Sequence, residues 1–132
     1  MLERIFEIFR RNETPAARIG RLGENAAAKF LAGEGMKIVA RNFRSGHGEI
    51  DIVARDAGCL VFVEVKTRSE NAVVDGYYAA VSKKKLAVLR KCARAFMSRM
   101  PNKPDNWRFD AVEVRHDRDG KPVSVRHFPS VG

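Results

Sequence analysis

Two short segments of the sequence contain the residue types that could bind a metal ion and act on a phosphodiester. Gly48-Glu49-Ile50-Asp51 supplies two carboxylates, and Phe62-Val63-Glu64-Val65-Lys66 supplies a third carboxylate and a lysine. Hard cations such as Mg²⁺ prefer carboxylate oxygens, and a bound ion lowers the pKa of water and neutralises charge that develops on a phosphate. A lysine beside it could hold a metal-bound water or the scissile phosphate. The combination indicates metal-assisted phosphodiester hydrolysis.

This chemistry requires the two segments to pair as a β-hairpin in one register. Residues 49–55 and 60–68 are predicted as strands, joined at the turn sequence Asp56-Ala57-Gly58. If Ala57 and Gly58 form the tip, one face gathers the charged pairs Asp51–Glu64 and Glu49–Lys66. The other face is then wholly aliphatic, with the pairs Ile50–Val65, Ile52–Val63 and Ala54–Val61. A bulge at Gly58 would shift the pairing by one residue and separate the aliphatic sets, so the hydrophobic pattern favours the first register.

A second interpretation of these charged residues is a solvated, salt-bridged face of the sheet. Like charges directly opposite each other destabilise a sheet, so Asp51 facing Glu64 calls for compensation by a cation or by Lys66. Both strands are otherwise strongly hydrophobic, and a charged set within them needs a reason. The spacing alone leaves the metal site and the solvated face both open.

The rest of the chain supplies the elements that must position this hairpin. At 132 residues it fits a single domain with a hydrophobic core. The predicted elements are a short amphipathic helix within 1–13, a helix from Thr14-Pro15 to Gly33, strands at 36–44, 49–55 and 60–68, a long helix capped by Ser82, and strands at 107–115 and 122–128. This order predicts one α/β domain over 14–132, with a central mixed β-sheet flanked by helices and an extra N-terminal helix at 1–13.

The charge balance indicates what the domain would bind. Lys and Arg number 25 against 16 Asp and Glu, which gives a formal net charge of +9 and favours polyanions such as nucleic acids. The alternative is a basic protein with no such partner. Two cysteines, Cys59 and Cys92, indicate neither a zinc site nor a disulfide framework. With no long apolar stretch and no signal-peptide pattern, we expect a cytoplasmic protein without a membrane partner.

Several segments together resemble a known family. They are Gly20–Glu24 with Ala27, Arg41-Asn42, Gly48–Asp51, Phe62–Arg68, Ala80-Val81 with Lys85, and Arg108-Phe109-Asp110. In combination they resemble the bacterial YraN-like family, which is largely uncharacterised and is similar to archaeal Holliday-junction resolvases and other PD-(D/E)XK nucleases. The resemblance runs from about Ile19 to the C-terminal strand. It implies a restriction-endonuclease-like core, and Ile50-Asp51 stands where the superfamily has its Pro-Asp.

The resemblance also implies roles for individual residues. Asp51, Glu64 and the backbone carbonyl of Val65 match metal ligands for Mg²⁺ or Mn²⁺, and Lys66 matches the catalytic lysine. Glu24 matches an acidic residue that completes or orients the site. Lys85 matches a basic position that faces the substrate. Resolvase-like relatives act as two-fold dimers, which makes a homodimer an open possibility.

A further set of residues has both a functional and a structural interpretation. Arg41, Arg44, Arg68 and Arg108 could contact nucleic acid together with Lys85, or could be ordinary surface charges. Asp110 is expected to be a structural partner of Arg108 rather than a third ligand. His47 is expected to be bystander surface. Trp107, with Tyr77 and Tyr78, could stack on bases, but core packing is the preferred interpretation.

Three hypotheses for function follow from these observations. The leading one is a metal-dependent endonuclease acting on DNA, with branched or structured DNA as one substrate class. The second is a nucleic-acid-binding accessory protein that keeps the site without turnover. The third is a partner-binding module whose N-terminal helix docks elsewhere.

Overall fold

The computed structural model describes residues 12–73 and 83–131. Its elements are α2 (Pro15–Gly33), β1 (Lys37–Ser45), β2 (Gly48–Asp56), β3 (Cys59–Ser69), α3 (Lys83–Ser98), β4 (Asn106–His116) and β5 (Pro122–Phe128). Their order and type confirm the predicted α/β fold. The helix predicted at 1–13 lies almost wholly outside the described residues, as do the Ser82 cap, Tyr77 and Tyr78.

Helix α2 begins where the capping signal predicted it. The Thr14 hydroxyl accepts a hydrogen bond from the Ala17 backbone N–H at 3.1 Å, and Pro15 occupies the first turn, where its missing N–H costs nothing. The helix ends at Gly33, and Gly35 follows with a φ of +97°, a conformation that glycine adopts without strain.

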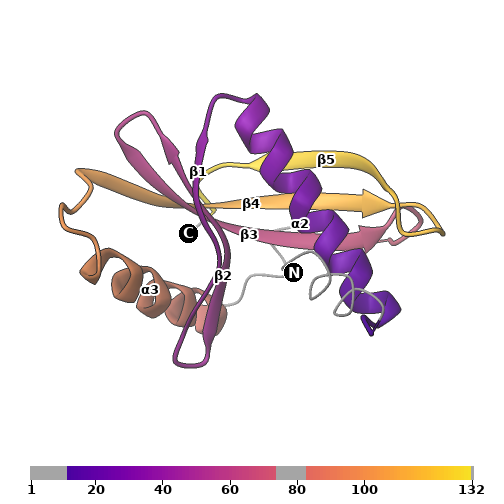
Figure 1. Cartoon of the computed structure of the whole chain (residues 1–132), viewed down its shortest axis with the longest axis horizontal. Coiled ribbons are helices and arrows are strands. Elements are labelled where there is room, and N and C mark those ends of the chain that lie inside the picture. The colour runs from indigo at the N-terminus through magenta and orange to yellow at the C-terminus, as the bar shows by residue number, and fades with distance from the viewer. Residues whose placement is uncertain (1–11, 74–82, 132) are drawn as a thin grey trace, which may run out of the picture.

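The five strands form one mixed sheet in the order β1-β2-β3-β4-β5. All neighbouring pairs are antiparallel except β3 and β4, which are parallel and are connected through α3. Figure 1 shows β1 and β2 running at a steep angle to β4 and β5, so the sheet is strongly twisted. The mixed sheet confirms the prediction, and the twist matters for the site because it turns β2 away from β3.

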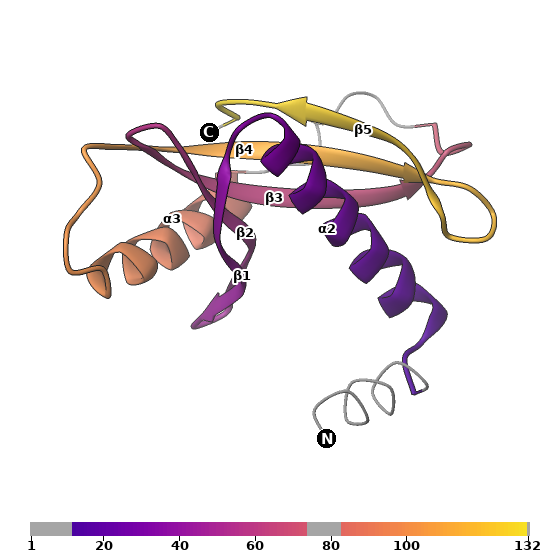
Figure 2. The same ribbon diagram turned by 45° about the horizontal axis from the view of Figure 1, so that its top comes forward.

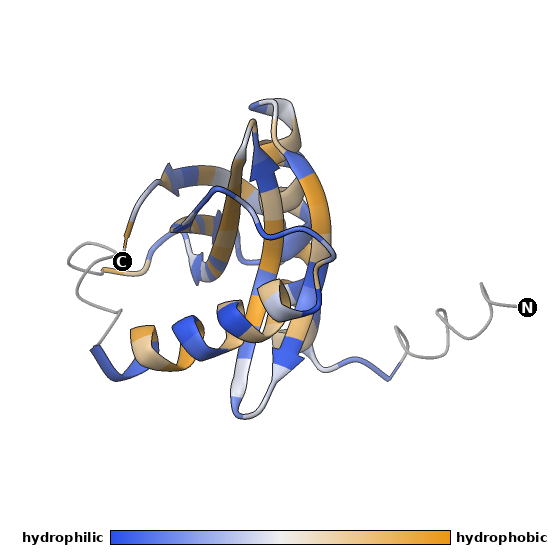
Figure 3. Ribbon diagram, turned by 90° about the vertical axis from the view of Figure 1, so that its left-hand side faces the viewer, coloured by the Kyte–Doolittle hydropathy of each residue, from blue (hydrophilic) through white to orange (hydrophobic). Residues whose placement is uncertain are grey.

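The two described helices cover opposite faces of the sheet. On β3, Val61 and Val63 belong to the cluster that includes Ala27 and Leu31 of α2, while Leu60 and Phe62 belong to the cluster around Leu89, Cys92 and Ala93 of α3. Figure 2 shows α2 and α3 lying apart against the sheet, and Figure 3 shows the amphipathic alternation along α3. The central strands are thus buried on both faces.

Helices in the described part of the chain lack the length and apolar content to cross a membrane.

Candidate active site

The β2–β3 hairpin has the predicted register, but its ladder is shorter than expected. Ile52 pairs with Val63, Ala54 with Val61 and Asp56 with Cys59, with Ala57 and Gly58 at the tip. The backbone pairing ends at Ile52 and Val63, so Asp51–Glu64 and Glu49–Lys66 are not ladder pairs in the structure. Figure 1 shows β2 and β3 running in different directions away from their shared turn. The predicted pairing of the charged residues is therefore wrong in its geometry, although both acids lie where the strands separate.

Where the two strands separate, the Asp51 side chain accepts a hydrogen bond from a backbone N–H of β3. Its Oδ2 accepts a hydrogen bond from the Val65 N–H at 2.7 Å, in place of a carbonyl from the neighbouring strand. Beyond this point Ile50 packs with the α3-side cluster, whereas Ile52 packs with the α2-side cluster. The expectation that Ile50 shares the aliphatic face of Ile52 is wrong, since residues two apart share a face only while a strand stays regular.

Two glycines bring the helices close to the strands on either side of the parting. A Cβ on Gly23 of α2 would lie 2.1 Å from Thr67 Oγ1 of β3, and a Cβ on Gly48 would lie 2.9 Å from Val88 Cγ1 of α3. Both distances are shorter than a van der Waals contact, so only glycine permits these approaches. Glu24 follows Gly23 directly on α2, and its charge acts on Asp51.

Three neighbouring carboxylates act electrostatically on Asp51. Burial raises the pKa of Asp51 to about 7; the Val65 hydrogen bond opposes this shift, while the charges of Glu24, Glu49 and Glu64 add to it. The pKa of Glu24 is also raised, chiefly by burial, against the lowering effect of Arg41. A half-buried acid beside three others is unfavourable when ionised, so this environment would favour a bound cation.

Asn42 is a residue at this site that the sequence interpretation left without a role. It lies on β1 between Arg41 and Phe43, which pair with Ile52 and Ile50, and therefore opposite Asp51. Its φ of +54° is a left-handed conformation that asparagine tolerates better than most residues. Its side chain also hydrogen-bonds Glu24 and lowers the pKa of that acid. A signal was present in the sequence, since asparagine inside an otherwise regular strand indicates an irregularity.

Each of the five cations predicted to contact nucleic acid lies beside an acidic side chain of the protein itself. The pairs are Arg41–Glu24 at 3.8 Å, Arg44–Glu49 at 3.6 Å, Arg68–Glu113 at 4.0 Å, Lys85–Glu64, and Arg108 with Asp110 at 2.9 Å and Asp56 at 3.2 Å. Three of these acids, Glu24, Glu49 and Glu64, are the ones whose charges act on Asp51. The contact of these cations with nucleic acid stays a prediction.

Lys66 differs from these cations. Its side chain is exposed on β3, and within residues 12–73 and 83–131 it forms no ion pair with Asp51 or Glu64. It is thus accessible to solvent, and the structure brings together the acids but not the lysine.

A divalent cation requires several donor atoms at one place. No group of three or more His, Cys, Asp or Glu side chains within the described residues is arranged to hold a metal ion. Mg²⁺, however, usually binds through one or two carboxylates and keeps several waters. Asp51, Glu64 and the Val65 carbonyl provide only oxygen donors, and burial together with three neighbouring acids raises the pKa of Asp51 to about 7. The residues therefore fit a two-carboxylate site for a hard cation.

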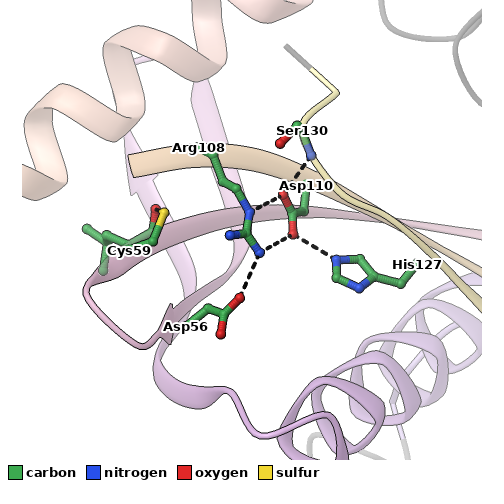
Figure 4. Close-up of polar contacts among 7 residues, drawn as sticks. Asp56, Cys59, Arg108, Asp110, His127 and Ser130 are labelled. Carbon is green, nitrogen blue, oxygen red and sulfur yellow. Dashed lines mark hydrogen bonds and ion pairs between the residues drawn. The ribbon is translucent and has the colours of Figure 1, made fainter. Parts of the chain in front are cut away.

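Asp110 belongs to a separate polar network, as predicted for a structural residue. Its buried carboxylate accepts hydrogen bonds from Arg108 Nε at 2.9 Å and from the Ser130 backbone N–H at 2.9 Å, and His127 Nε2 lies 2.7 Å away (Figure 4). The network joins β4, β5, the C-terminal segment and, through Asp56, the tip of the β2–β3 hairpin. The expected Arg108–Asp110 partnership is confirmed.

Comparison with known proteins places these features in a sequence family. The model of the Uncharacterised protein family UPF0102, the YraN-like group, matches residues 23–114. A UPF0102 protein of Symbiobacterium thermophilum is 45% identical over 105 residues, which cover 79% of this chain and 87% of that protein. One of Parafrankia sp. is 44% identical over 110 residues, covering 83% and 92% respectively. The matched region contains Glu24, Asp51, Glu64 and Lys66.

Proposed function

Because this chain belongs to the uncharacterised protein family UPF0102, which resembles the PD-(D/E)XK nucleases, we propose that it binds nucleic acid and hydrolyses DNA phosphodiester bonds with Mg²⁺ or Mn²⁺. The observation that carries the proposal is the environment of Asp51. Its pKa is raised to about 7 by burial and by three neighbouring acids. Strong perturbation of a titratable group by burial and by specific charges is typical of functional sites.

The chain's own residues have distinct parts in this proposal. Asp51, Glu64 and the Val65 carbonyl would hold the ion, and the Val65 N–H fixes the orientation of the Asp51 carboxylate. When bound, the ion would lower the pKa of water and neutralise charge on the phosphate. Lys66, exposed on β3, would donate hydrogen bonds to the phosphate or to the attacking water. Glu24, paired with Arg41, would orient the site from α2.

A non-catalytic nucleic-acid-binding protein is the second candidate, and one observation favours it. The Lys85 ammonium pairs with the Glu64 carboxylate, so a positive charge of the protein already neutralises one of the two proposed ligands. A metal ion at this site would compete with that ion pair. In the accessory protein Lys85 keeps its place and the basic surface binds nucleic acid without turnover.

The experiment that separates the two candidates is a cleavage assay. The purified protein is incubated with labelled duplex, single-stranded, flap and four-way-junction DNA, with and without Mn²⁺. The endonuclease proposal predicts metal-dependent products that disappear in Asp51→Asn and in Lys66→Ala. Salt-sensitive binding without products under any of these conditions would support the accessory protein, and absence of binding would contradict both.

Matched controls for these variants come from the far part of α2. Glu34→Gln removes an exposed carboxylate at the C-cap of α2, and Lys29→Ala removes an exposed lysine on the same helix. Both should leave cleavage unchanged, so a loss in the site variants would not reflect a general change in charge.

A further inference from the structure

The outer face of α3 carries basic side chains without acidic partners. The helix from Lys83 to Ser98 contains no acidic residue. Besides Lys85, its exposed basic residues are Lys83, Lys84, Arg90, Lys91 and Arg94. Residues three or four apart lie side by side on a helix, so these side chains form a stripe along one face. Within the described part of the chain none of the five has an ion-pair partner, in contrast to Lys85, which turns toward Glu64.

This stripe leads to a pocket at the C-terminal end of α3. The pocket has a volume of about 410 Å³ and is lined by Arg94, Met97, Ser98, Lys103, Pro104 and Trp107. Two of these residues are cations, and Lys103 also has no ion-pair partner among the described residues. A pocket with two cations and an aromatic ring favours a ligand that is both anionic and aromatic.

Trp107 is suited to present its ring to such a ligand. It packs nearly perpendicular to Phe62 and Phe109, with ring centroids 6.0 and 5.5 Å apart, yet 39% of the residue remains exposed. The contacts with the core restrict the ring, which lowers the entropy lost when a planar ligand stacks on it. Trp107 therefore packs against the core, as the preferred interpretation of the sequence has it, while part of the residue faces solvent.

We propose that this pocket binds an unpaired nucleotide of a nucleic-acid strand, with the base stacked on Trp107 and the flanking phosphates on Arg94 and Lys103. Base stacking on aromatic side chains in a basic groove is the general means by which proteins bind single strands. An acidic peptide would satisfy the cations but would leave the exposed ring without a partner. This inference rests on the proposed function, because the bound strand is the flank of the substrate.

The position of the pocket also defines the class of substrate. Helix α3 has 16 residues and is therefore about 24 Å long. Lys85, which contacts Glu64 of the candidate active site, lies near one end of the helix, and the pocket lies at the other. The arrangement fits DNA in which an unpaired segment lies some distance from the scissile phosphate, as in a flap, a gap or an open junction, rather than a continuous blunt duplex.

Trp107 is the only tryptophan of the chain, so its fluorescence reports directly on this pocket. The full chain is titrated in EDTA with a short oligothymidylate, with a blunt duplex of equal length and with polyglutamate. We expect the oligothymidylate to quench the fluorescence, and the blunt duplex and polyglutamate to leave it nearly unchanged. Quenching by polyglutamate with no response to the oligothymidylate would overturn the proposal in favour of an acidic protein partner.

Variants separate stacking from charge. Binding of a labelled oligothymidylate is followed by anisotropy, and Trp107→Leu should weaken it about 10-fold or more, with Trp107→Phe retaining part of the affinity. Arg94→Ala and Lys103→Ala should each reduce the slope of log K against log salt by about 0.7. Lys29→Ala on α2 is the matched control and should change neither quantity. Circular dichroism melting of each variant shows whether a loss of binding reflects unfolding.

Failure of this inference is distinguishable from failure of the proposed function. If DNA is cleaved in a metal-dependent manner while Trp107 fluorescence does not respond and Trp107→Leu binds as the parent does, the pocket has no such role and the endonuclease proposal stands. If the oligothymidylate quenches Trp107 but no substrate is cut, the pocket is supported and the catalytic proposal fails.

Discussion

Asp51 and Asp110 are both aspartates on central strands, and their environments have opposite effects. Burial raises the pKa of each. Around Asp51 three acidic neighbours add to this effect and bring its pKa to about 7. Around Asp110 the hydrogen bonds from Arg108, the Ser130 N–H and His127 outweigh burial and lower its pKa. The Asp51 carboxylate is surrounded by other acids, whereas the Asp110 carboxylate is paired with hydrogen-bond donors.

The difference separates a structural acid from a functional one. A buried carboxylate that is surrounded by donors contributes to stability, and removing it leaves its partners unsatisfied. A carboxylate that is kept ionisable among other acids costs stability, which is typical of residues retained for binding or catalysis. The comparison predicts that conservative substitutions of the two residues change stability in opposite directions.

The largest effect is expected at Asp110. Asp110→Asn should lower the free energy of unfolding by about 3 kcal/mol, because it leaves Arg108 and His127 without their anionic partner. In thermal melts this corresponds to a decrease in Tm of roughly 10 °C. Asp105→Asn, an exposed aspartate in the loop before β4, is the control and should change Tm little. A Tm equal to that of the parent would contradict the structural role of the network.

The same substitution should show a defined pH dependence. Because the folded-state pKa of Asp110 lies below its ordinary value of 3.8, the stability it contributes is fully present above that pH. It is lost as the pH falls through the lowered folded-state pKa. The Tm difference between the parent and Asp110→Asn should therefore shrink below about pH 4.

A smaller loss is expected at the glycine that brings α2 to the site. Gly23→Ala places a methyl group 2.1 Å from Thr67 Oγ1 and should destabilise the fold by about 1–3 kcal/mol, with reduced cleavage because Glu24 moves with the helix. Gly20→Ala is the matched control on the same helix, since nothing lies within 4 Å of its Cβ. It should gain up to about 1 kcal/mol from helix propensity. Equal effects of the two substitutions in chemical denaturation would refute the close approach.

The opposite sign is expected at Asp51. The folded-state pKa of Asp51 is raised from 3.8 to about 7, so its ionised form lowers the free energy of unfolding. This destabilisation is absent below pH 4 and is fully present above pH 7. Asp51→Asn should therefore raise the free energy of unfolding by about 1–2 kcal/mol at pH 8 without metal. This gain is smaller than the full pKa shift of Asp51 would give, because the site is partly solvated. The gain, followed by thermal melts, should shrink toward pH 4. Destabilisation at pH 8 would place Asp51 with Asp110 as a structural acid.

Much of the fold follows from local sequence signals. Thr14-Pro15 predicted the start of α2, and Ala57-Gly58 between alternating apolar residues predicted the hairpin register from Ile52 to Asp56. The Arg108–Asp110 contact was also predictable, because residues two apart on a strand share a face. In each case the partners are close in sequence or are fixed by a short turn.

The geometry of the candidate site depended on interactions that no local pattern reveals. The ladder ends at Ile52, and beyond it the Asp51 carboxylate accepts the Val65 N–H, although spacing alone would keep the strands paired. The close approaches at Gly23 and Gly48 depend on how each helix packs on the sheet. For the same reason Asn42 was not assigned to the surroundings of Asp51.

The central claim is that Asp51 and Glu64 together bind a divalent cation. Calorimetric titration of Mn²⁺ at pH 8, where Asp51 is ionised, tests it most directly. We predict one saturable site in the parent and in Glu34→Gln, and no measurable site in Asp51→Asn, whose fold the thermal melts will have verified. Equal Mn²⁺ binding by the parent and Asp51→Asn, or no binding by either, would contradict the account.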